Sequence, residues 1–404
     1  MSAHSLARDT RIIGLVALAH GLSHFYQIVT GVLFPFIRDD LGVSYAALGA
    51  TTAAFYVVSG VCQTLAGFAV DRFGARRVLF GGLALCVAGA LLAGLARNYE
   101  MLFLAALVGG LGNSVFHPCD FSILNARVTA TRLGYAFSWH GIAGFLGYAA
   151  APAFGIGLAA AFGWREALLL AAALGGVIVV LLATQREGLY VEPADSRRPV
   201  SRAAFSDDLR LLTSLPVLMC FGYFILIAVG FIAIQTFGVA TMIALYNANA
   251  ALASAALTAY LLGAAAGIFT GGFLATRFHR HDLVAVTGML FSAIVVLVIA
   301  EAWLPASSLP ALFAAAGFAG GATNPSRDMI VRANTPAGAT GKVYGFVYSG
   351  LDVGSMATPI FFGWLLDHGR PSAVFYSVVA ASVLTILTVL NLPRRPAEVA
   401  VQPR

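Results

Sequence analysis

The strongest constraint on this chain is a series of about a dozen apolar blocks, each about 20 residues or longer. A helix of about 20 apolar residues is long enough to cross the hydrocarbon core of a bilayer. Charged residues make up only 10% of the chain, against about 25% in ordinary globular domains, so water cannot be the solvent for most of its surface. We therefore expect a multi-pass membrane protein.

The apolar blocks predict twelve spans. The alternating strand patterns of a barrel are absent, and helices are the other way to satisfy every backbone group in lipid. The first block follows two arginines as a signal peptide would, but its length and internal polar residues favour a retained helix. The expected fold class is an all-α membrane protein with twelve transmembrane helices, at 11–37, 44–70, 78–96, 101–126, 133–156, 163–184, 211–237, 246–275, 283–302, 308–331, 341–366 and 371–391.

Lysine and arginine are distributed unevenly among the predicted loops. With the N-terminus inside, nineteen of them fall on the cytoplasmic side and four on the opposite side, and Arg327 alone lies within a span. Cytoplasmic loops carry such an excess of positive charge. We therefore expect both termini in the cytoplasm and the chain in a bacterial-type inner membrane, as a monomer. The net charge of +6 needs no nucleic-acid partner.

Two long segments of the chain are similar to each other. LVGGLGNSVFHPCDFSILNARVTATRLGYAFSWHGIAGFLGYAAAP, from Leu107, aligns with FAAAGFAGGATNPSRDMIVRANTPAGATGKVYGFVYSGLDVGSMATP, from Phe313, and five identical residues are each 207 positions apart. A second match pairs GFAVDRFGARR, from Gly67, with GFLATRFHRHD, from Gly272. The matches indicate a duplication: two pseudo-symmetric six-helix bundles, at 1–184 and 211–404, joined by a cytoplasmic linker at 185–210.

Two short motifs point to a family. GFAVDRFGARR follows the second predicted helix, and FGWR at 162–165 opens the sixth. On these motifs the chain resembles the major facilitator superfamily over essentially its whole length, with Ala75 where that family often has a basic residue. The resemblance implies alternating access between the two bundles. It also implies a conformational switch in the cytoplasmic loop, formed by Gly67, Asp71, Arg72, Gly74, Arg76 and Arg77.

Polar residues inside the predicted helices recur every three or four positions, so each set shares one helix face. NSVFHPCDFS, at 113–122, contains one such stripe, which Pro118 is expected to bend. Polar groups in lipid are costly unless they face a bundle interior or water, so we expect the stripes to line one aqueous path. The residues predicted to bind substrate there are His20, His24, Gln27, Asn113, His140, Asn324, Arg327 and Tyr348.

Ionisable residues within the spans are the candidates for proton coupling and gating. His117, Asp120 and Asp352 are the predicted proton carriers, because histidine titrates near neutral pH and ionisable groups inside a membrane are functional by default. Asp120 and Arg327 occupy equivalent positions in the two halves. We predict that they pair as a gate when the cytoplasmic side closes. The alternatives are a fixed salt bridge or local pairing of Arg327 with Asp328.

The imidazoles of His20, His24, His117 and His140, together with Asp120, could also form a metal site, since zinc and iron accept such ligands. Helical spacing permits that site without requiring it. Proton handling is favoured, and no metal or cofactor is expected. No GxxxxGK loop is present, which argues against ATP as the energy source.

The fourth and fifth predicted helices carry a further resemblance. The HP turn and HGIAGFLG are similar to exporters of the fosmidomycin-resistance type, and the glycine-rich fifth helix resembles that of drug/proton antiporters, with Ala151 in place of the usual glycine. The resemblance implies proton-coupled export of a small polar or anionic compound. Proton symport of an organic acid is the alternative. A membrane-embedded enzyme would need a base beside Cys119, and a sensor would need a soluble output domain; neither is evident.

Overall fold

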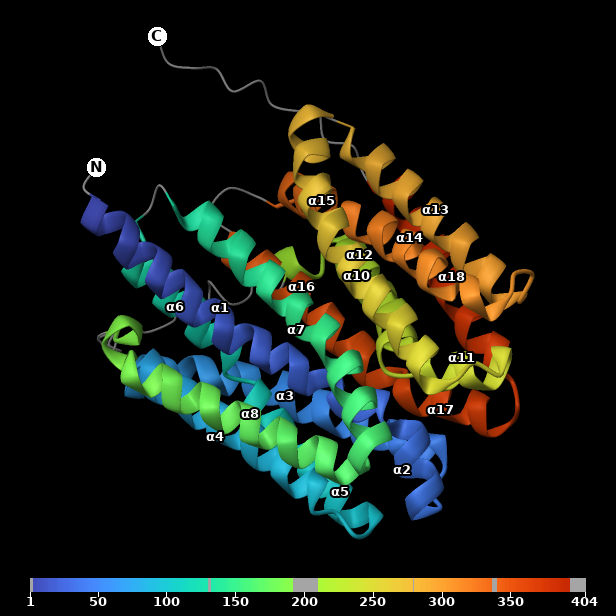
Figure 1. The fold of residues 1–404 in the computed structure, drawn as a ribbon. Helices are drawn as coiled ribbons and strands as arrows, with labels where there is room; N and C mark the ends of the chain where they lie inside the picture. Colours follow the sequence, from blue (N-terminus) through green and yellow to red (C-terminus); the bar gives the residue numbers. More distant parts are fainter. Residues whose placement is uncertain (1–2, 130–131, 192–209, 279, 336–339, 393–404) are drawn as a thin grey trace.

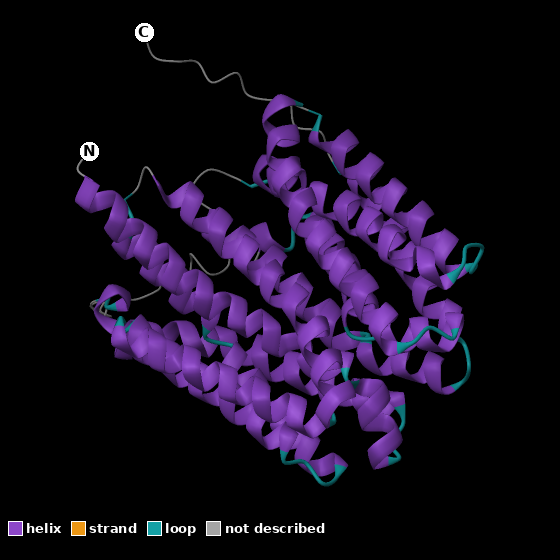
Figure 2. Ribbon diagram, viewed as in Figure 1, coloured by secondary structure: helices purple, strands orange, loops and turns teal. Residues whose placement is uncertain are grey.

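The computed structural model describes residues 3–129, 132–191, 210–278, 280–335 and 340–392, and the regular structure within these ranges is helical (Figure 2). The helices run side by side in two groups (Figure 1). The first half of the chain, blue to green, forms one group, and the second half, yellow to red, forms the other. The start of the first helix and the end of the last helix lie at the same end of the molecule, which we call the terminal end.

Both halves consist of long helices and helices that are broken into two. The first half contains α1 (Ala3–Val32), α2 (Phe34–Leu41), α3 (Tyr45–Phe73), α4 (Ala75–Gly94), α5 (Tyr99–Asn113), α6 (Phe116–Arg127), α7 (Leu133–Phe162), α8 (Trp164–Thr184) and the 3-10 turn η2 (Arg186–Leu189). The second half contains α10 (Leu215–Gln235), α11 (Gly238–Tyr246), α12 (Ala250–Arg277), α13 (His281–Ala300), η3 (Ala306–Ser308), α14 (Leu309–Ala322), α15 (Asn324–Ala333), α16 (Thr340–Ala357), α17 (Pro359–Asp367) and α18 (Pro371–Asn391).

Each predicted span corresponds to one of these helices or to two in succession. Within the described ranges, 10 segments are long and apolar enough to cross a membrane. The other two predicted spans, 308–331 and 341–366, are divided between α14 and α15 and between α16 and α17. The predicted fold class, twelve spans in two related bundles, is therefore confirmed.

Proline accounts for most of the helix breaks. Pro35, Pro325 and Pro359 occupy the first or second position of α2, α15 and α17, where the missing N–H is not needed. Pro118 is the third residue of α6, and its ring clashes with a carbonyl group in regular helical position four residues earlier, at Ser114. The regular helix is interrupted at Ser114 and Val115, whose backbone dihedrals stay in the right-handed helical region, so the bend expected in NSVFHPCDFS lies between α5 and α6.

The two halves of the chain meet at the end opposite to the terminal end, where α3 lies against α17. A Cβ atom on Gly363 would lie only 2.3 Å from the carbonyl oxygen of Tyr45, so the two backbones approach closely. The carboxylate of Asp367 accepts hydrogen bonds from the backbone N–H groups of Tyr45 and Ala46, each at 2.8 Å. Asp367 of one half thus caps the N-terminus of a helix of the other half.

Glycine also sets the distance between α1 and α7 inside the first half. A Cβ atom on Gly147 would lie 1.9 Å from the carbonyl oxygen of Gly21. No larger residue fits between these helices unless they move apart. The close approach brings the polar face of α1, with His20 and His24, directly against α7.

Candidate functional site

Imidazoles from α1 and α7 meet a carboxylate of α6 inside the first half. His140 Nε2 lies 3.0 Å from Asp120 Oδ2 and forms a hydrogen bond with it. His20 Nδ1 lies 3.0 Å from the same oxygen, and the rings of His20 and His140 stack with their centres 3.5 Å apart. Asp120 is 0% exposed. One buried carboxylate is therefore hydrogen-bonded to one imidazole and lies within ion-pair distance of a second imidazole from another helix.

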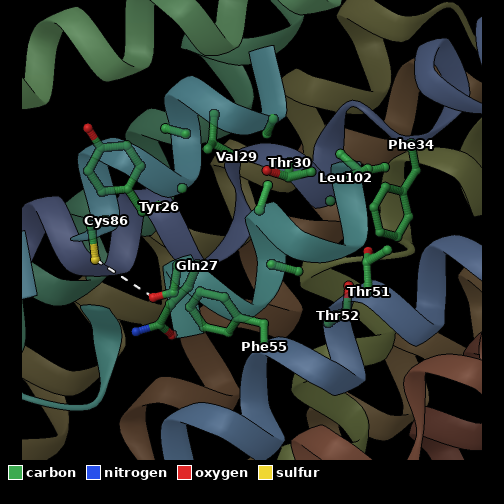
Figure 3. A pocket seen from close by; sticks show the side chains of 17 residues that line it. Tyr26, Gln27, Val29, Thr30, Phe34, Thr51, Thr52, Phe55, Cys86 and Leu102 are labelled. Carbon is green, nitrogen blue, oxygen red and sulfur yellow. Dashed lines mark hydrogen bonds between the residues drawn. The ribbon is translucent and has the colours of Figure 1, made fainter. Parts of the chain in front are cut away.

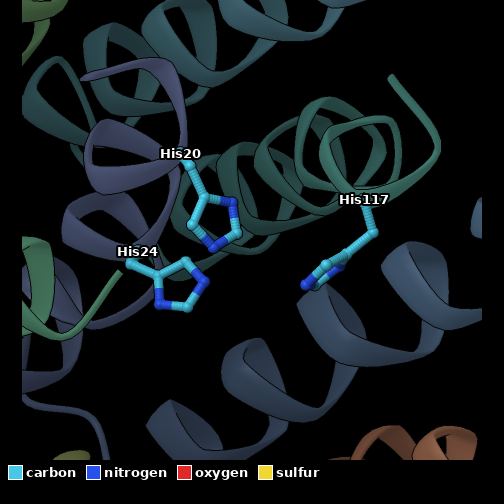
Figure 4. Close-up of side chains that lie close together, drawn as sticks. All are labelled: His20, His24 and His117. Carbon is cyan, nitrogen blue, oxygen red and sulfur yellow. The ribbon is translucent and has the colours of Figure 1, made fainter. Parts of the chain in front are cut away.

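Two further imidazoles extend this group toward accessible space. The ring of His24 lies 4.3 Å from that of His20, and the ring of His117 lies 5.4 Å from it, centre to centre. Figure 4 shows these three rings turned toward a shared space. His117 is exposed, and its Nδ1 lies 3.4 Å from the side-chain oxygen of Gln63. We call His20, His24, His117, His140 and Asp120 together the histidine cluster.

A chain of hydrogen bonds lies next to the histidine cluster and connects four helices. Tyr148 Oη donates to Gln27 Oε1 at 2.6 Å, Gln27 Nε2 donates to Asn113 Oδ1 at 3.0 Å, and Asn113 Nδ2 donates to Ser59 Oγ at 2.8 Å. Two predicted substrate-binding residues, Gln27 and Asn113, are thus brought together. Tyr148 was missed, although it lies eight residues after His140 and therefore on the same helix face.

A cavity adjoins the amide group of Gln27, between α1, α3, α4 and α5 (Figure 3). Its wall is mainly apolar and aromatic, with Tyr26, Phe34 and Phe55 as its aromatic residues, and Thr52 adds a hydroxyl group. The thiol of Cys86 also borders the cavity. The first half therefore offers an apolar surface directly beside its polar network.

Arg327 of α15 is the centre of a second polar group, in the other half. Its Nε donates to Asp328 Oδ1 at 3.0 Å, and its Nη1 donates to Asn324 Oδ1 at 3.4 Å. The guanidinium carbon lies 4.7 Å from the ring centre of Phe224 and 5.7 Å from that of Tyr348. The predicted residues Asn324, Arg327 and Tyr348 are thus brought together, whereas the sequence held no polar signal for Phe224.

The two residues of the predicted gate have separate partners in this conformation. Asp120 is engaged by His20 and His140, and Arg327 is engaged by Asp328. The local pairing that the sequence left open for Arg327 is the one observed here. A direct pairing of Asp120 with Arg327 stays a prediction for the state in which the terminal end is closed.

Asp352 of α16 lies at the contact between the halves. A Cβ atom on Gly60 of α3 would lie 3.3 Å from the Cβ atom of Asp352. The carboxylate therefore lies against the backbone of the opposite half. Its predicted role in proton coupling remains a prediction.

The predicted switch residues lie at the terminal end, around the turn between α3 and α4. Gly74 has a φ of 85°, which residues with a side chain rarely adopt. Arg76 Nη1 lies 3.2 Å from Glu187 Oε1, so it binds the segment that follows α8. The side chain of Asp71 is outside the part that the structure describes. Of the others, Arg72 and Arg77 are exposed and Gly67 has open space beside it.

Comparison with known proteins gives relatives that match parts of the chain. A multidrug resistance protein B homolog of Mycobacterium tuberculosis is 31% identical over 211 residues, which are 52% of this chain and 37% of that protein. The fosmidomycin resistance protein of Escherichia coli is 26% identical over 170 residues, 42% of each protein. The chain thus matches less than half the length of these curated relatives.

Solved structures and a family model match far more of the chain. The nucleoside transporter NupG superposes with a TM-score of 0.78 at 15% identity, covering 96% of this chain and 100% of that one, which shows a shared fold. The family model described as Major Facilitator Superfamily matches residues 16–250 and 219–404. On this match, which extends over both halves, the chain belongs to the Major Facilitator Superfamily.

Proposed function

We propose that this protein is a proton-coupled secondary transporter that exports a small polar or anionic organic compound by alternating access. The observation that carries the proposal is the position of the buried ionisable side chains. They form the histidine cluster in one half and the Arg327 group in the other. Ionisable groups within membrane spans mark substrate and ion pathways, and two halves that each contribute such a group suit a carrier.

The arrangement of the halves supports a state that is open toward the terminal end. The contacts of Asp367 with Tyr45 and Ala46 hold the opposite end together. The excess of lysine and arginine assigns the terminal end to the cytoplasm. In this proposal, alternating access breaks the Asp367 contacts while the cytoplasmic end closes.

Arg327 favours an anionic substrate. A guanidinium group presents several N–H donors in one plane, which suits a carboxylate or a phosphate-like group. The rings of Phe224 and Tyr348 flank it and would contact the apolar part of an organic anion. The similarity to proteins named for fosmidomycin resistance and multidrug resistance supports export over uptake.

We assign the transported proton to Asp352. A neutral carboxyl group can stay packed against the α3 backbone beside Gly60, whereas a charged one in the same place needs water or a partner. Protonation of Asp352 would therefore favour contact between the halves at this point. Deprotonation would favour their separation, which couples the proton to the conformational change.

The test uses the purified protein in vesicles with an imposed pH gradient. A growth screen against a panel of toxic organic anions first selects the solute. Wild-type protein should then move that solute against its gradient, with proton flux that depends on the solute. Asp352→Asn should abolish this accumulation but retain solute exchange, and Asp39→Asn, an exposed control paired with its neighbour Arg38, should behave as wild type. Absence of solute-dependent proton flux for every member of the panel would overturn the proposal.

A further inference from the structure

We propose that His20, His24 and His117 form a binding site for a divalent transition metal ion of the zinc class. The site goes beyond the proposed transport function and does not depend on it. The sequence favoured proton handling for these residues, and their arrangement in space is what points to a metal. Neutral imidazole is the most common protein ligand for such ions.

The three rings have the right spacing for a shared ion. One nitrogen from each of His20, His24 and His117 lies within 4.8 Å of the others. Zinc binds imidazole nitrogen at about 2.0–2.1 Å, so the ligands of a tetrahedral ion are roughly 3.4 Å apart. In this proposal, rotations of the three side chains close the difference when the ion binds.

Two ring nitrogens border the same space beside α7. The position of a Cβ atom on Gly144 would be 2.8 Å from His24 Nδ1 and 3.2 Å from His20 Nε2. Because residue 144 is glycine, that space is not filled by a side chain. His24 Nδ1 is buried and has no hydrogen-bond partner among the described residues, whereas buried polar atoms normally have one. A metal ion would supply the missing partner.

Asp120 supports the site from the opposite side of His20. His20 Nε2 faces the space beside Gly144, and Nδ1 of the same ring lies 3.0 Å from Asp120 Oδ2 without forming a hydrogen bond in this conformation. Histidines that bind metals almost always place their other ring nitrogen against a carboxylate, a carbonyl group or water. Asp120 is in turn held by His140 at 3.0 Å. In the metal-bound state that we propose, Asp120 and His140 are positioning residues, which orient one ligand ring.

Three protein ligands leave one position of a tetrahedral ion free. Sites of this kind bind water or a small molecule at the fourth position. His117 is exposed, whereas His20 is buried, so the ion would be reached from the His117 side. Water or an anionic group of a small molecule could complete the coordination there.

The experiment is a titration of the full-length protein in nanodiscs, without an affinity tag, with Co²⁺. Wild-type protein should bind one equivalent, show the intense visible absorption of tetrahedral Co²⁺, and lose it when Zn²⁺ is added. His24→Gln and His117→Gln should each weaken binding by at least about 100-fold, and Asp120→Asn by about 10- to 100-fold, as for other partners of metal-binding histidines. His368→Gln, at the exposed end of α17, is the matched control and should bind as wild type does.

Thermal unfolding with and without Zn²⁺ separates loss of the site from loss of the fold. A metal that binds only the folded protein raises its stability, so Zn²⁺ should raise the Tm of wild type but not of His117→Gln. Because His117 is exposed, the metal-free Tm of that variant should match wild type. A wild-type protein with neither the Co²⁺ spectrum nor Zn²⁺-dependent stabilisation at micromolar metal would overturn the proposal. Undiminished binding by both His24→Gln and His117→Gln would do the same. Binding is measured at equilibrium, so a failed transport assay leaves this result unaffected.

Discussion

Replacing Asp367 with alanine should open the end of the molecule that lies opposite to the termini. The Asp367 carboxylate accepts two backbone hydrogen bonds at the start of α3, at 2.8 Å each. Loss of a helix cap costs about 0.5–2 kcal/mol, and the interaction of the negative charge with the helix end adds about 0.3–1 kcal/mol. The hydrogen bonds are exposed to solvent, so we expect a total of about 1–2 kcal/mol. This energy is present only while the two halves touch, so its loss should shift the equilibrium toward the open state by about 5- to 30-fold.

The shift can be measured as a change in distance between the halves. Spin labels at Glu100, in the first turn of α5, and at Ser307, before α14, occupy exposed positions in different halves at this end. The four native cysteines, three of which are buried, are replaced first. The distance distribution of Asp367→Ala should gain a longer component, and Asp367→Asn, which keeps one acceptor oxygen, should gain less of it.

Asp39→Ala provides the control for the loss of an acidic side chain in this region. Asp39 pairs with its neighbour Arg38 at 3.4 Å, and this pair lies within the first half. Its removal should therefore leave the distance distribution unchanged. If Asp367→Ala and Asp39→Ala give the same distribution as the parent protein, the cap does not hold the halves together and the reasoning is refuted.

Three further predictions follow from the packing and charges of the described residues. Gly147→Ala should lower the Tm strongly, because overpacking costs about 1–3 kcal/mol even where neighbouring side chains can move and the neighbouring atoms here belong to the backbone. Gly141→Ala, which has open space around it, should leave the Tm unchanged. Arg327→Lys should raise the KM for an anionic solute by about 2- to 30-fold, corresponding to the roughly 0.5–2 kcal/mol of a cation–π contact; an unchanged KM would argue against a role for the flanking rings. Asp328→Asn should shift the equilibrium by at least about tenfold toward the state in which Arg327 meets Asp120. Removing one partner of a fully buried ion pair costs about 3–5 kcal/mol, and the cost here is smaller because Asp328 is 38% exposed. Labels placed at the terminal end would show no change if the gate pair does not form.

The sequence was sufficient to predict which residues share a helix face, but not which faces meet. His20 and His24 lie one turn apart on α1, and His117 and Asp120 lie one turn apart on α6, so helical spacing identified both pairs. Their convergence depends on the close approach of α1 and α7, which Gly21 and Gly147 permit. In a chain with 43 glycines, Gly147 belongs to the glycine-rich motif of the fifth predicted helix, but nothing in the sequence identifies Gly21 as its partner. The position of a helix break was equally hard to predict, because a proline such as Pro118 disturbs the helix at the residue four positions before it.

The similarity of the two halves was enough to predict the equivalent positions of Asp120 and Arg327, but not the partners of these two residues. Positions 120 and 327 are equivalent and carry opposite charges, so a pairing across the path was the simplest inference. A buried charge, however, needs a partner in every conformation that the protein visits, including the one in which the two halves are apart at that point. The structure supplies such partners locally, with His20 and His140 at Asp120 and Asp328 at Arg327. Any gate that opens and closes must have these substitute partners, so their presence is compatible with a switch between two sets of ion pairs. Because both residues have partners in either state, pairing Asp120 with Arg327 stabilises the closed state only by the difference between the two sets of ion pairs. The free-energy difference between the two conformations then stays small enough for solute and proton binding to reverse it.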